Sequence, residues 1–185
     1  MRIIIAGGTG LIGKALTESL LENGHQVWIL TRDPQKATLQ GSAQRVGWDG
    51  RTSKGWESLV SQVDAIVNLT GESLGTGPWT RKRKNRILSS RVDSGKAISD
   101  AILQANPRPK VLIQASAVGF YGSLGAEPAT EDSAPGRGFL AQVCEAWENS
   151  SRPVEESGVR RVILRTGVVL SPGEGTLQRM MLPFK

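Results

Sequence analysis

The chain contains only one cysteine, one histidine and one tyrosine in 185 residues. Because Cys144 is alone, an intrachain disulfide and a multi-cysteine metal site are both excluded, which agrees with a reducing compartment. A Ser-His-Asp triad would have to use His25, which follows the turn-forming pair Asn23-Gly24, and we interpret it as a solvated turn residue. A zinc site lacks ligands, so we predict no metal centre.

Long apolar runs are also missing. No uninterrupted apolar stretch approaches the roughly 20 residues that a membrane helix needs. The first predicted strand starts at residue 2, with no charged, apolar and cleavage regions of a signal peptide ahead of it. The content of 38% hydrophobic and 22% charged residues is ordinary for one globular domain. We expect no membrane binding and a cytoplasmic location, or an organelle stroma or matrix if a transit peptide has been removed.

Acidic residues are absent from 79 to 91, where six basic residues lie: Arg81, Lys82, Arg83, Lys84, Arg86 and Arg91. The net charge is +6, and the other 17 basic residues balance the 17 acidic ones, so the excess is local. A surface that tracks nucleic acid would spread its charge and interleave aromatic residues. We interpret the segment first as a solvated helix start, second as a source of contacts to an anionic cofactor or substrate, and third as a nucleic-acid site. We predict no nucleic-acid binding.

A glycine-rich turn stands between an apolar run at 3–6 and an amphipathic run that begins at Leu11. This order predicts a strand, a tight turn and a helix. Glycines at this spacing form a turn, let the backbone approach a pyrophosphate, and bring helix and strand together, with the phosphates at the positive end of the helix. We predict a dinucleotide site rather than a plain turn, with contacts from Gly7, Thr9, Gly10, Leu11, Ile12 and Gly13.

The next apolar run, at 26–30, ends in Thr31 and Arg32. An NAD enzyme usually has Asp or Glu here for the ribose 2′-hydroxyl, whereas Arg accommodates the 2′-phosphate of NADP. Thr31 and Arg32 therefore favour NADP(H); the alternative is a surface arginine at a strand end.

Further strands are predicted at 45–49, 65–69, 110–116 and 161–165, with helices between them, which indicates a doubly wound parallel α/β sheet. Leu69 and Thr70 follow one strand and would line the cofactor. A helix from about 79 to 105 places Arg91 on the same face as Leu88, Val92, Gly95, Ile98 and Ile102. A charge there needs a partner, so Arg91 is a cofactor or structural salt-bridge candidate. The segment 123–138 is predicted to be a loop over the site.

Several segments together resemble the extended short-chain dehydrogenase/reductase superfamily: the glycine turn, 68–72, 116–122, 139–148 and 165–170. The string 139–148 and Leu182-Pro183-Phe184 make the chain similar to an atypical epimerase-like branch, often labelled sugar-nucleotide epimerase or SulA-type cell-division inhibitor. The resemblance covers essentially all 185 residues. It implies a Rossmann fold that binds NADP(H), with Arg86 and Arg91 as further cofactor contacts.

Two features depart from this family. Its reductases use a Tyr and a Lys with three residues between them, but Tyr121 is followed four positions later by Gly125, so no such pair exists here. Phe139 and Val143 stand where the family pattern would place the pair. Related extended members also continue for about another hundred residues, so we expect residues 1–185 to be an incomplete NADP-binding Rossmann domain without the C-terminal substrate part.

The remaining catalytic candidates are Ser116, which could polarise a carbonyl, and Tyr121, the only phenol. The alternative for Tyr121 is that its ring packs under the loop with Phe120; Cys144 is interpreted as inert packing. We hypothesise an NADP(H)-dependent oxidoreductase or epimerase-like protein for a small-molecule substrate. The alternative is a non-catalytic nucleotide-binding regulator, for example of cell division, and a homodimer is left open.

Overall fold

A computed structural model describes residues 1–185 except 36–40, 126, 173–174 and 182–185. The predicted Leu182-Pro183-Phe184 segment lies outside the described residues. The described strands form one parallel sheet in the order β3-β2-β1-β4-β5-β6. Their bounds are β1 Arg2–Ala6, β2 Gln26–Thr31, β3 Gln44–Gly47, β4 Ala65–Asn68, β5 Val111–Ala117 and β6 Arg160–Thr166.

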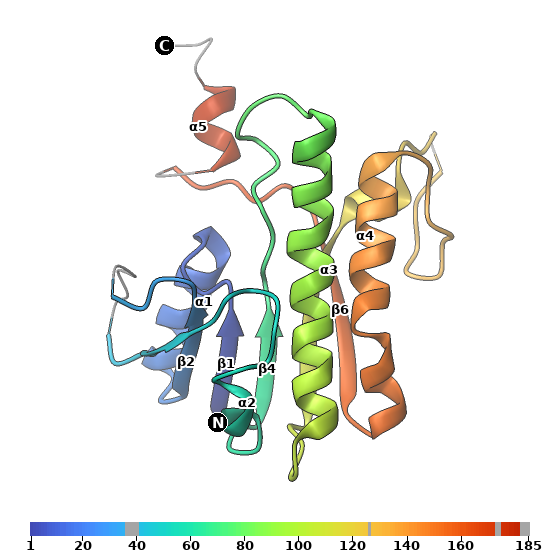
Figure 1. Ribbon diagram of the computed structural model, residues 1–185. Helices are drawn as coiled ribbons and strands as arrows, with labels where there is room; N and C mark the ends of the chain where they lie inside the picture. Colours follow the sequence, from blue (N-terminus) through green and yellow to red (C-terminus); the bar gives the residue numbers. More distant parts are fainter. Residues whose placement is uncertain (36–40, 126, 173–174, 182–185) are drawn as a thin grey trace.

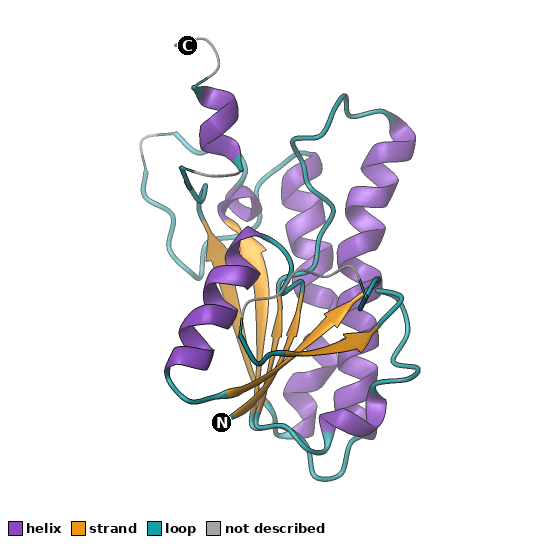
Figure 2. Ribbon diagram, turned by 90° about the vertical axis from the view of Figure 1, so that its left-hand side faces the viewer, coloured by secondary structure: helices purple, strands orange, loops and turns teal. Residues whose placement is uncertain are grey.

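Helices alternate with the strands and cover the sheet on both faces (Figures 1 and 2). The α-helices are α1 Leu11–Glu22, α2 Glu57–Val60, α3 Arg81–Gln104, α4 Phe139–Ser150 and α5 Thr176–Met180, and the 3-10 helices are η1 Val118–Tyr121 and η2 Arg152–Ser157. Helix α1 lies on one face, whereas α3 and α4 lie on the other. Strands β2 and β3 are added on one side of β1, and β4 to β6 on the other, so the strand order switches between β1 and β4. The ligand crevice of a doubly wound fold is therefore expected at the carboxyl ends of these two strands.

The two faces of the sheet carry separate cores because neighbouring residues of a strand point to opposite sides. Ile4 and Ile66 pack with Ile98 and Ile102 of α3, and Ile3 and Ile5 belong to the core on the α1 side. Every residue from Ile3 to Ala6 is therefore buried, as expected for a central parallel strand.

Helix α3 is the longest element described, and its packing differs from the sequence prediction in one turn. Ile87 is fully buried, whereas Leu88 and Val92 are half-buried. Further along, Gly95 is in direct contact with α4, because a Cβ at this position would overlap the Ser150 hydroxyl. Gly95, Ile98 and Ile102 are buried as predicted, and the buried stripe also includes Ile87 and Ser94.

No helix in the described part of the chain combines the length and the apolar character needed to cross a bilayer. The predicted strands are confirmed with shifts of one or two residues at their ends; the short strand expected at 45–49, for instance, is Gln44–Gly47. The turn at Asn23-Gly24 is confirmed too, since Gly24 has a φ of 75° and ends α1.

Candidate functional site

The glycine turn connects β1 to α1, and its glycines have different neighbours. A Cβ on Gly13 would lie 2.4 Å from the Gly7 carbonyl oxygen, so Gly13 permits the close contact of helix and turn. Gly7 has a φ of 84°, and a Cβ there would also meet the Leu69 backbone at 2.8 Å. At Gly10, by contrast, the described residues beyond its chain neighbours place one atom within 4 Å of an added Cβ, the Gly7 oxygen at 3.4 Å. Gly10 is exposed, so its backbone borders open space.

The amino terminus of α1 faces this open space. Gly10 is the N-cap and provides no side-chain cap, and the first turn contains no acidic residue. Thr9 and Ile12 are exposed beside it and Leu11 is half-buried. Backbone amides and the positive end of the helix dipole at such a terminus favour a bound phosphate. The geometry fits the pyrophosphate of a dinucleotide.

Strand β2 lies beside β1, with Leu30 paired to Ala6, and this brings Thr31 and Arg32 next to the glycine turn. The Thr31 side-chain oxygen accepts a hydrogen bond from the Asp33 amide at 3.3 Å. Arg32 is exposed and forms no ion pair with any residue that the structure describes. Its guanidinium is therefore available at the strand end where the adenosine side of a dinucleotide would lie.

On the other side of β1, the end of β4 is fixed by buried amides. Asn68 donates to the Gln114 side chain on β5 at 2.9 Å, and both side chains are fully buried. The Thr70 hydroxyl lies 2.5 Å from Asn68 Oδ1 and 2.5 Å from Ser94 Oγ of α3. Leu69 and Thr70 are half-buried at this edge, and the network holds their backbone in one position.

Ser116 on β5 is enclosed rather than open to the crevice. It is 2% exposed, and its hydroxyl donates to Glu148 Oε1 on α4 at 2.6 Å. Arg165 on β6 binds the same carboxylate through two bonds of 2.9 and 3.0 Å. These bonds raise the pKa of Arg165. The Ser116 hydroxyl proton is thus used in a hydrogen bond to Glu148. Together with the Glu148–Arg165 ion pair, this bond connects β5, β6 and α4.

Tyr121 is attached to the same arginine. Its hydroxyl accepts a hydrogen bond from Arg165 Nη1 at 3.0 Å, and the guanidinium stacks over the Phe120 ring at 3.6 Å. Arg165 also donates to the Glu131 carbonyl in the loop 122–138, so it joins this loop to the sheet. The Tyr121 ring meets the Phe120 ring edge to face at 5.4 Å, so Tyr121 does pack against Phe120. Tyr121 is half-buried, and no described acceptor takes its hydroxyl proton.

The basic segment of α3 is only in part the solvated helix start that we expected: Arg81, Lys82 and Arg86 are exposed, whereas Arg83 is buried. Arg83 is 7% exposed and binds the Thr76 carbonyl, the Thr76 hydroxyl and the Ser73 carbonyl. Arg86 pairs with Glu72 at 3.2 Å, and Arg91 donates to the Glu72 carbonyl at 3.1 Å. Three of the six basic residues therefore hold the loop 71–80: Arg83 and Arg91 bind its carbonyls, and Arg86 pairs with the Glu72 carboxylate.

Phe139 and Val143, which stand where the family pattern places Tyr and Lys, lie at the start of α4. Phe139 meets Trp79 edge to face at 5.6 Å and lies under the Lys84 ammonium at 5.3 Å. Val143 is 3% exposed. Cys144 beside it is also buried, and burial raises the pKa of its thiol, which agrees with inert packing.

Glu148 and Arg165 were not singled out from the sequence. For Glu148 a signal existed, because it lies four residues after Cys144 on the buried face of its helix, and the argument that identified Arg91, a charge among core positions, applies to it. Arg165 is the next-to-last residue of β6, which has no fully buried position and contains two further arginines, so it carried no comparable signal.

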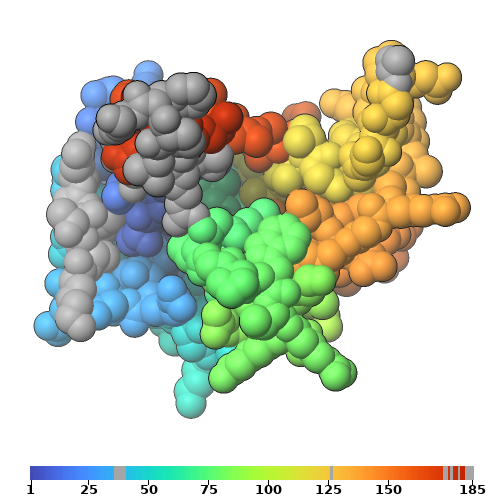
Figure 3. Space-filling view, turned by 90° about the horizontal axis from the view of Figure 1, so that it is seen from above, coloured from blue at the N-terminus to red at the C-terminus, as the bar shows by residue number. Residues whose placement is uncertain are grey.

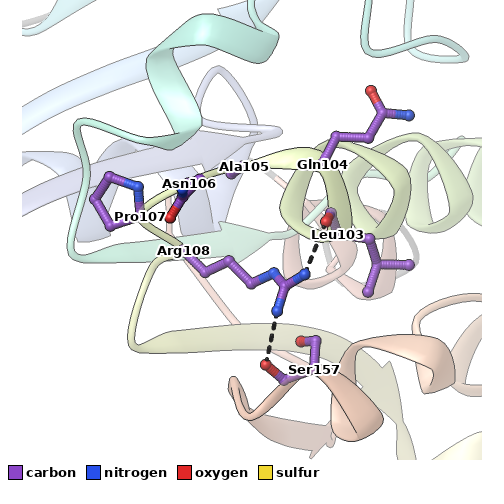
Figure 4. Close-up of a pocket in the computed structure, with 7 residues that line it drawn as sticks. All are labelled: Leu103, Gln104, Ala105, Asn106, Pro107, Arg108 and Ser157. Atoms are coloured by element: carbon purple, nitrogen blue, oxygen red, sulfur yellow. Dashed lines mark hydrogen bonds between the residues drawn. The ribbon is translucent and has the colours of Figure 1, made fainter.

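The predicted site residues gather at one end of the sheet. Seen from above in Figure 3, the surface is hollowed between the glycine turn, the loop 71–80 and the segment after β5. A pocket of 570 Å³ at the opposite end is formed by the end of α3 and Ser157 (Figure 4). There Arg108 donates to the Leu103 and Ser157 carbonyls. The pocket therefore lies at the carboxyl end of α3, where an arginine provides a hydrogen-bond donor to a carbonyl of the last helical turn.

A parallel sheet in this order, with a glycine turn after its first strand, defines a Rossmann-type nucleotide-binding fold. The sequence matches the NAD dependent epimerase/dehydratase family over residues 3–184. The chain belongs to this family, as an atypical epimerase-like member of the short-chain dehydrogenases/reductases.

Individual relatives support this assignment. The chain is 39% identical to the epimerase family protein YfhF of Bacillus subtilis, over 100% of this chain and 60% of that protein. It is 35% identical to bovine epimerase family protein SDR39U1, with the same coverage of 100% and 60%. The crystal structure of human SDR39U1 (isoform 2) with NADPH superposes with a TM-score of 0.85 at 31% identity, over 100% of this chain and 59% of that one. The chain thus spans about 60% of the length of these relatives.

Proposed function

We propose that this protein binds NADP(H) in the crevice at the carboxyl ends of β1, β2 and β4. The observation that carries the proposal is the open edge of Gly10 at the uncapped amino terminus of α1. The pyrophosphate would lie on the α1 amides, and Leu69 and Thr70 would line the nicotinamide half.

Arg32 is proposed to select the phosphorylated cofactor. A guanidinium pairs bidentately with a phosphate, and this one is exposed beside the turn without an ion-pair partner among the described residues. The NADPH complex of human SDR39U1, at 31% identity, supports the same preference.

We further propose an oxidoreductase or epimerase-like reaction that uses Tyr121 in place of the missing Tyr/Lys pair. Reduction of a carbonyl needs a positioned proton donor, and such a donor typically contributes about 10²- to 10⁴-fold. Tyr121 accepts a bond from Arg165 and keeps its own proton free to donate to a substrate oxygen. Ser116 donates to Glu148, so its proposed role is to position the Glu148–Arg165 pair behind Tyr121.

Phe139 and the buried Val143 favour a second candidate, a nucleotide-binding regulator without turnover. Cofactor binding is common to both candidates, and turnover separates them. Full-length protein incubated with NADPH and a panel of carbonyl compounds, with nicotinamide absorbance recorded, tests which one applies. We expect weak or absent turnover on ordinary sugar nucleotides, and any activity found should fall in Tyr121→Phe.

Calorimetry with NADPH and NADH tests the cofactor proposal. We expect tighter binding of NADPH, and loss of the preference in Arg32→Ala but not in Arg160→Ala, since Arg160 is exposed at the opposite end of the sheet. Equal affinities of the parent protein for both cofactors would rule out the role of Arg32, and absence of binding would rule out the proposed function.

A further inference from the structure

Three side chains outside the proposed cofactor contacts meet where α3 and α4 begin. Trp79 lies in the loop 71–80, Lys84 in the first turn of α3, and Phe139 is the first residue of α4. The Trp79 and Phe139 rings meet edge to face with their centroids 5.6 Å apart, and Lys84 Nζ lies 5.3 Å from the Phe139 centroid. Both helices begin at the carboxyl end of the sheet, where the crevice opens (Figure 1). We call Trp79, Lys84 and Phe139 the aromatic cluster.

Trp79 is exposed and yet held in one orientation. It is 39% exposed, and its Nε1 donates to the Leu74 carbonyl at 2.9 Å. The loop that contains both residues is held in turn by the buried Arg83, which binds the Ser73 carbonyl at 2.7 Å. A ligand that covers a ring already held in place gains apolar contact and loses little conformational entropy. Trp79 is therefore well placed to contact a ligand.

Lys84 brings a positive charge without a counter-ion. It is half-buried, whereas Arg81 and Lys82 before it are exposed. It forms no ion pair with any residue of the described ranges. The ammonium contacts the face of the Phe139 ring, and it also carries three hydrogen-bond donors. A carboxylate that lies beside this ring can therefore accept a charge-assisted hydrogen bond from Lys84.

The surface next to the aromatic cluster is mainly apolar. Val118 directly follows β5 and is 48% exposed. The next residue, Gly119, packs on α4, since an added Cβ there would lie 3.5 Å from Leu140 Cβ. Ser116, a polar residue near the end of β5, is only 2% exposed. A sugar needs hydrogen-bond partners for its hydroxyl groups, so a flat apolar ring suits this side of the crevice better.

We propose that the aromatic cluster binds the substrate and selects an aromatic carboxylate. The substrate ring would lie against Trp79 and Phe139, and Lys84 would bind the carboxylate. A carboxylate can lie in the plane of the ring to which it is attached, so one flat molecule contacts both rings and reaches the ammonium. The inference rests on the proposed function, because it names the substrate class of the same crevice. It makes Trp79, Lys84 and Phe139 specificity-determining residues.

The test uses the full chain saturated with NADPH, so that the cofactor site is occupied. Benzoate is compared with cyclohexanecarboxylate, which has the charge without an aromatic face, and with benzamide, which has the ring without the charge. Each is titrated while the tryptophan indole N–H resonances of ¹⁵N-labelled protein are recorded, and the Trp79 resonance is the one missing from Trp79→Phe. We expect benzoate to shift this resonance. It should bind about tenfold more tightly than benzamide, the gain of a charge-assisted hydrogen bond, and about threefold more tightly than cyclohexanecarboxylate, the gain of an aromatic contact.

Two variants separate the ring from the charge. Lys84→Met keeps the length of the side chain and removes its charge, so it should bind benzoate about tenfold more weakly and leave NADPH affinity unchanged. Phe139→Leu keeps an apolar side chain without a ring and should reduce the preference for benzoate over cyclohexanecarboxylate. The control is Lys82→Met, at an exposed residue of the same helix, which should behave as the parent.

The inference is overturned if benzoate does not shift the Trp79 resonance of the parent, an observation that needs no substitution at the cluster. It is also overturned if benzoate binds the parent no more tightly than benzamide or cyclohexanecarboxylate, because the charge or the ring would then not be recognised. Loss of NADPH affinity in Lys84→Met would place Lys84 in the cofactor site and overturn its assignment to the substrate. Failure of the parent to bind NADPH contradicts the proposed function instead, and calorimetry with NADPH alone shows this separately.

Discussion

Alanine at two glycines of the same turn should affect different properties of the protein. Gly13→Ala should lower its stability, and Gly10→Ala should lower its affinity for NADPH. At Gly13, an added Cβ would lie 2.4 Å from the Gly7 oxygen and 2.6 Å from Gly8 Cα. Both are backbone atoms, so the turn would have to move by roughly 1 Å to restore ordinary contact. Overpacking of this kind costs about 3 kcal/mol, and the better helix propensity of alanine offsets about 1 kcal/mol. We expect Gly13→Ala to lower the free energy of unfolding by about 2 kcal/mol.

Gly10 lacks such neighbours and has a φ of −82°, which alanine adopts freely. Gly10→Ala at the N-cap should cost only about 0.5 kcal/mol of stability. Its Cβ, however, would enter the space proposed for the pyrophosphate and remove amide contacts. We expect NADPH to bind Gly10→Ala about tenfold or more weakly, the loss of one or two charge-assisted hydrogen bonds.

Urea unfolding followed by tryptophan fluorescence measures the first effect, and calorimetry with NADPH measures the second. The two variants form a matched pair, because each adds one methyl group to the same turn. Equal stability of Gly13→Ala and the parent would refute the packing argument. Parent-like NADPH affinity of Gly10→Ala would refute the placement of the pyrophosphate.

Three further predictions follow from buried or engaged charges. Glu148→Gln removes the carboxylate that pairs with Arg165, and because the Glu148 side chain is only 11% exposed, we expect the free energy of unfolding to fall by about 3 kcal/mol. Glu155→Gln breaks a pair whose carboxylate is 49% exposed and should lower the free energy of unfolding by under about 1 kcal/mol. Equal losses for the two variants in urea unfolding would contradict this prediction. Burial raises the pKa of the Cys144 thiol, so a thiol reagent should modify it slowly at pH 8 and rapidly after unfolding. Since the folded thiol holds its proton more tightly, stability should fall as pH rises through the unfolded pKa of about 8.5, and rapid modification of native protein would contradict burial. We expect no DNA or RNA binding at physiological ionic strength, and a salt-dependent gel shift abolished by neutralising Arg81, Lys82 and Lys84 would overturn this.

The sequence by itself determined the order of strands and helices and the location of the glycine turn. These features follow from local patterns: the apolar run 3–6, the glycines at 7, 10 and 13, and the left-handed turn at Gly24 are all decided within a few residues. The parallel sheet also follows, because alternating strands and helices leave few other arrangements.

Only the tertiary structure decided which side chains meet. Ser116 and Glu148 are 32 residues apart, and nothing local shows that the serine hydroxyl turns toward α4 rather than toward a substrate. Arg83 turns inward although its neighbours are exposed, because the carbonyls of the loop 71–80 need donors. Arg91 was recognised from the sequence as a charge among core positions, yet its placement against the Glu72 carbonyl, the Trp147 ring and Gly71 became visible only in the structure. Periodicity reports which face of an element is buried, whereas the partner of a polar group is set by packing between elements distant in the chain.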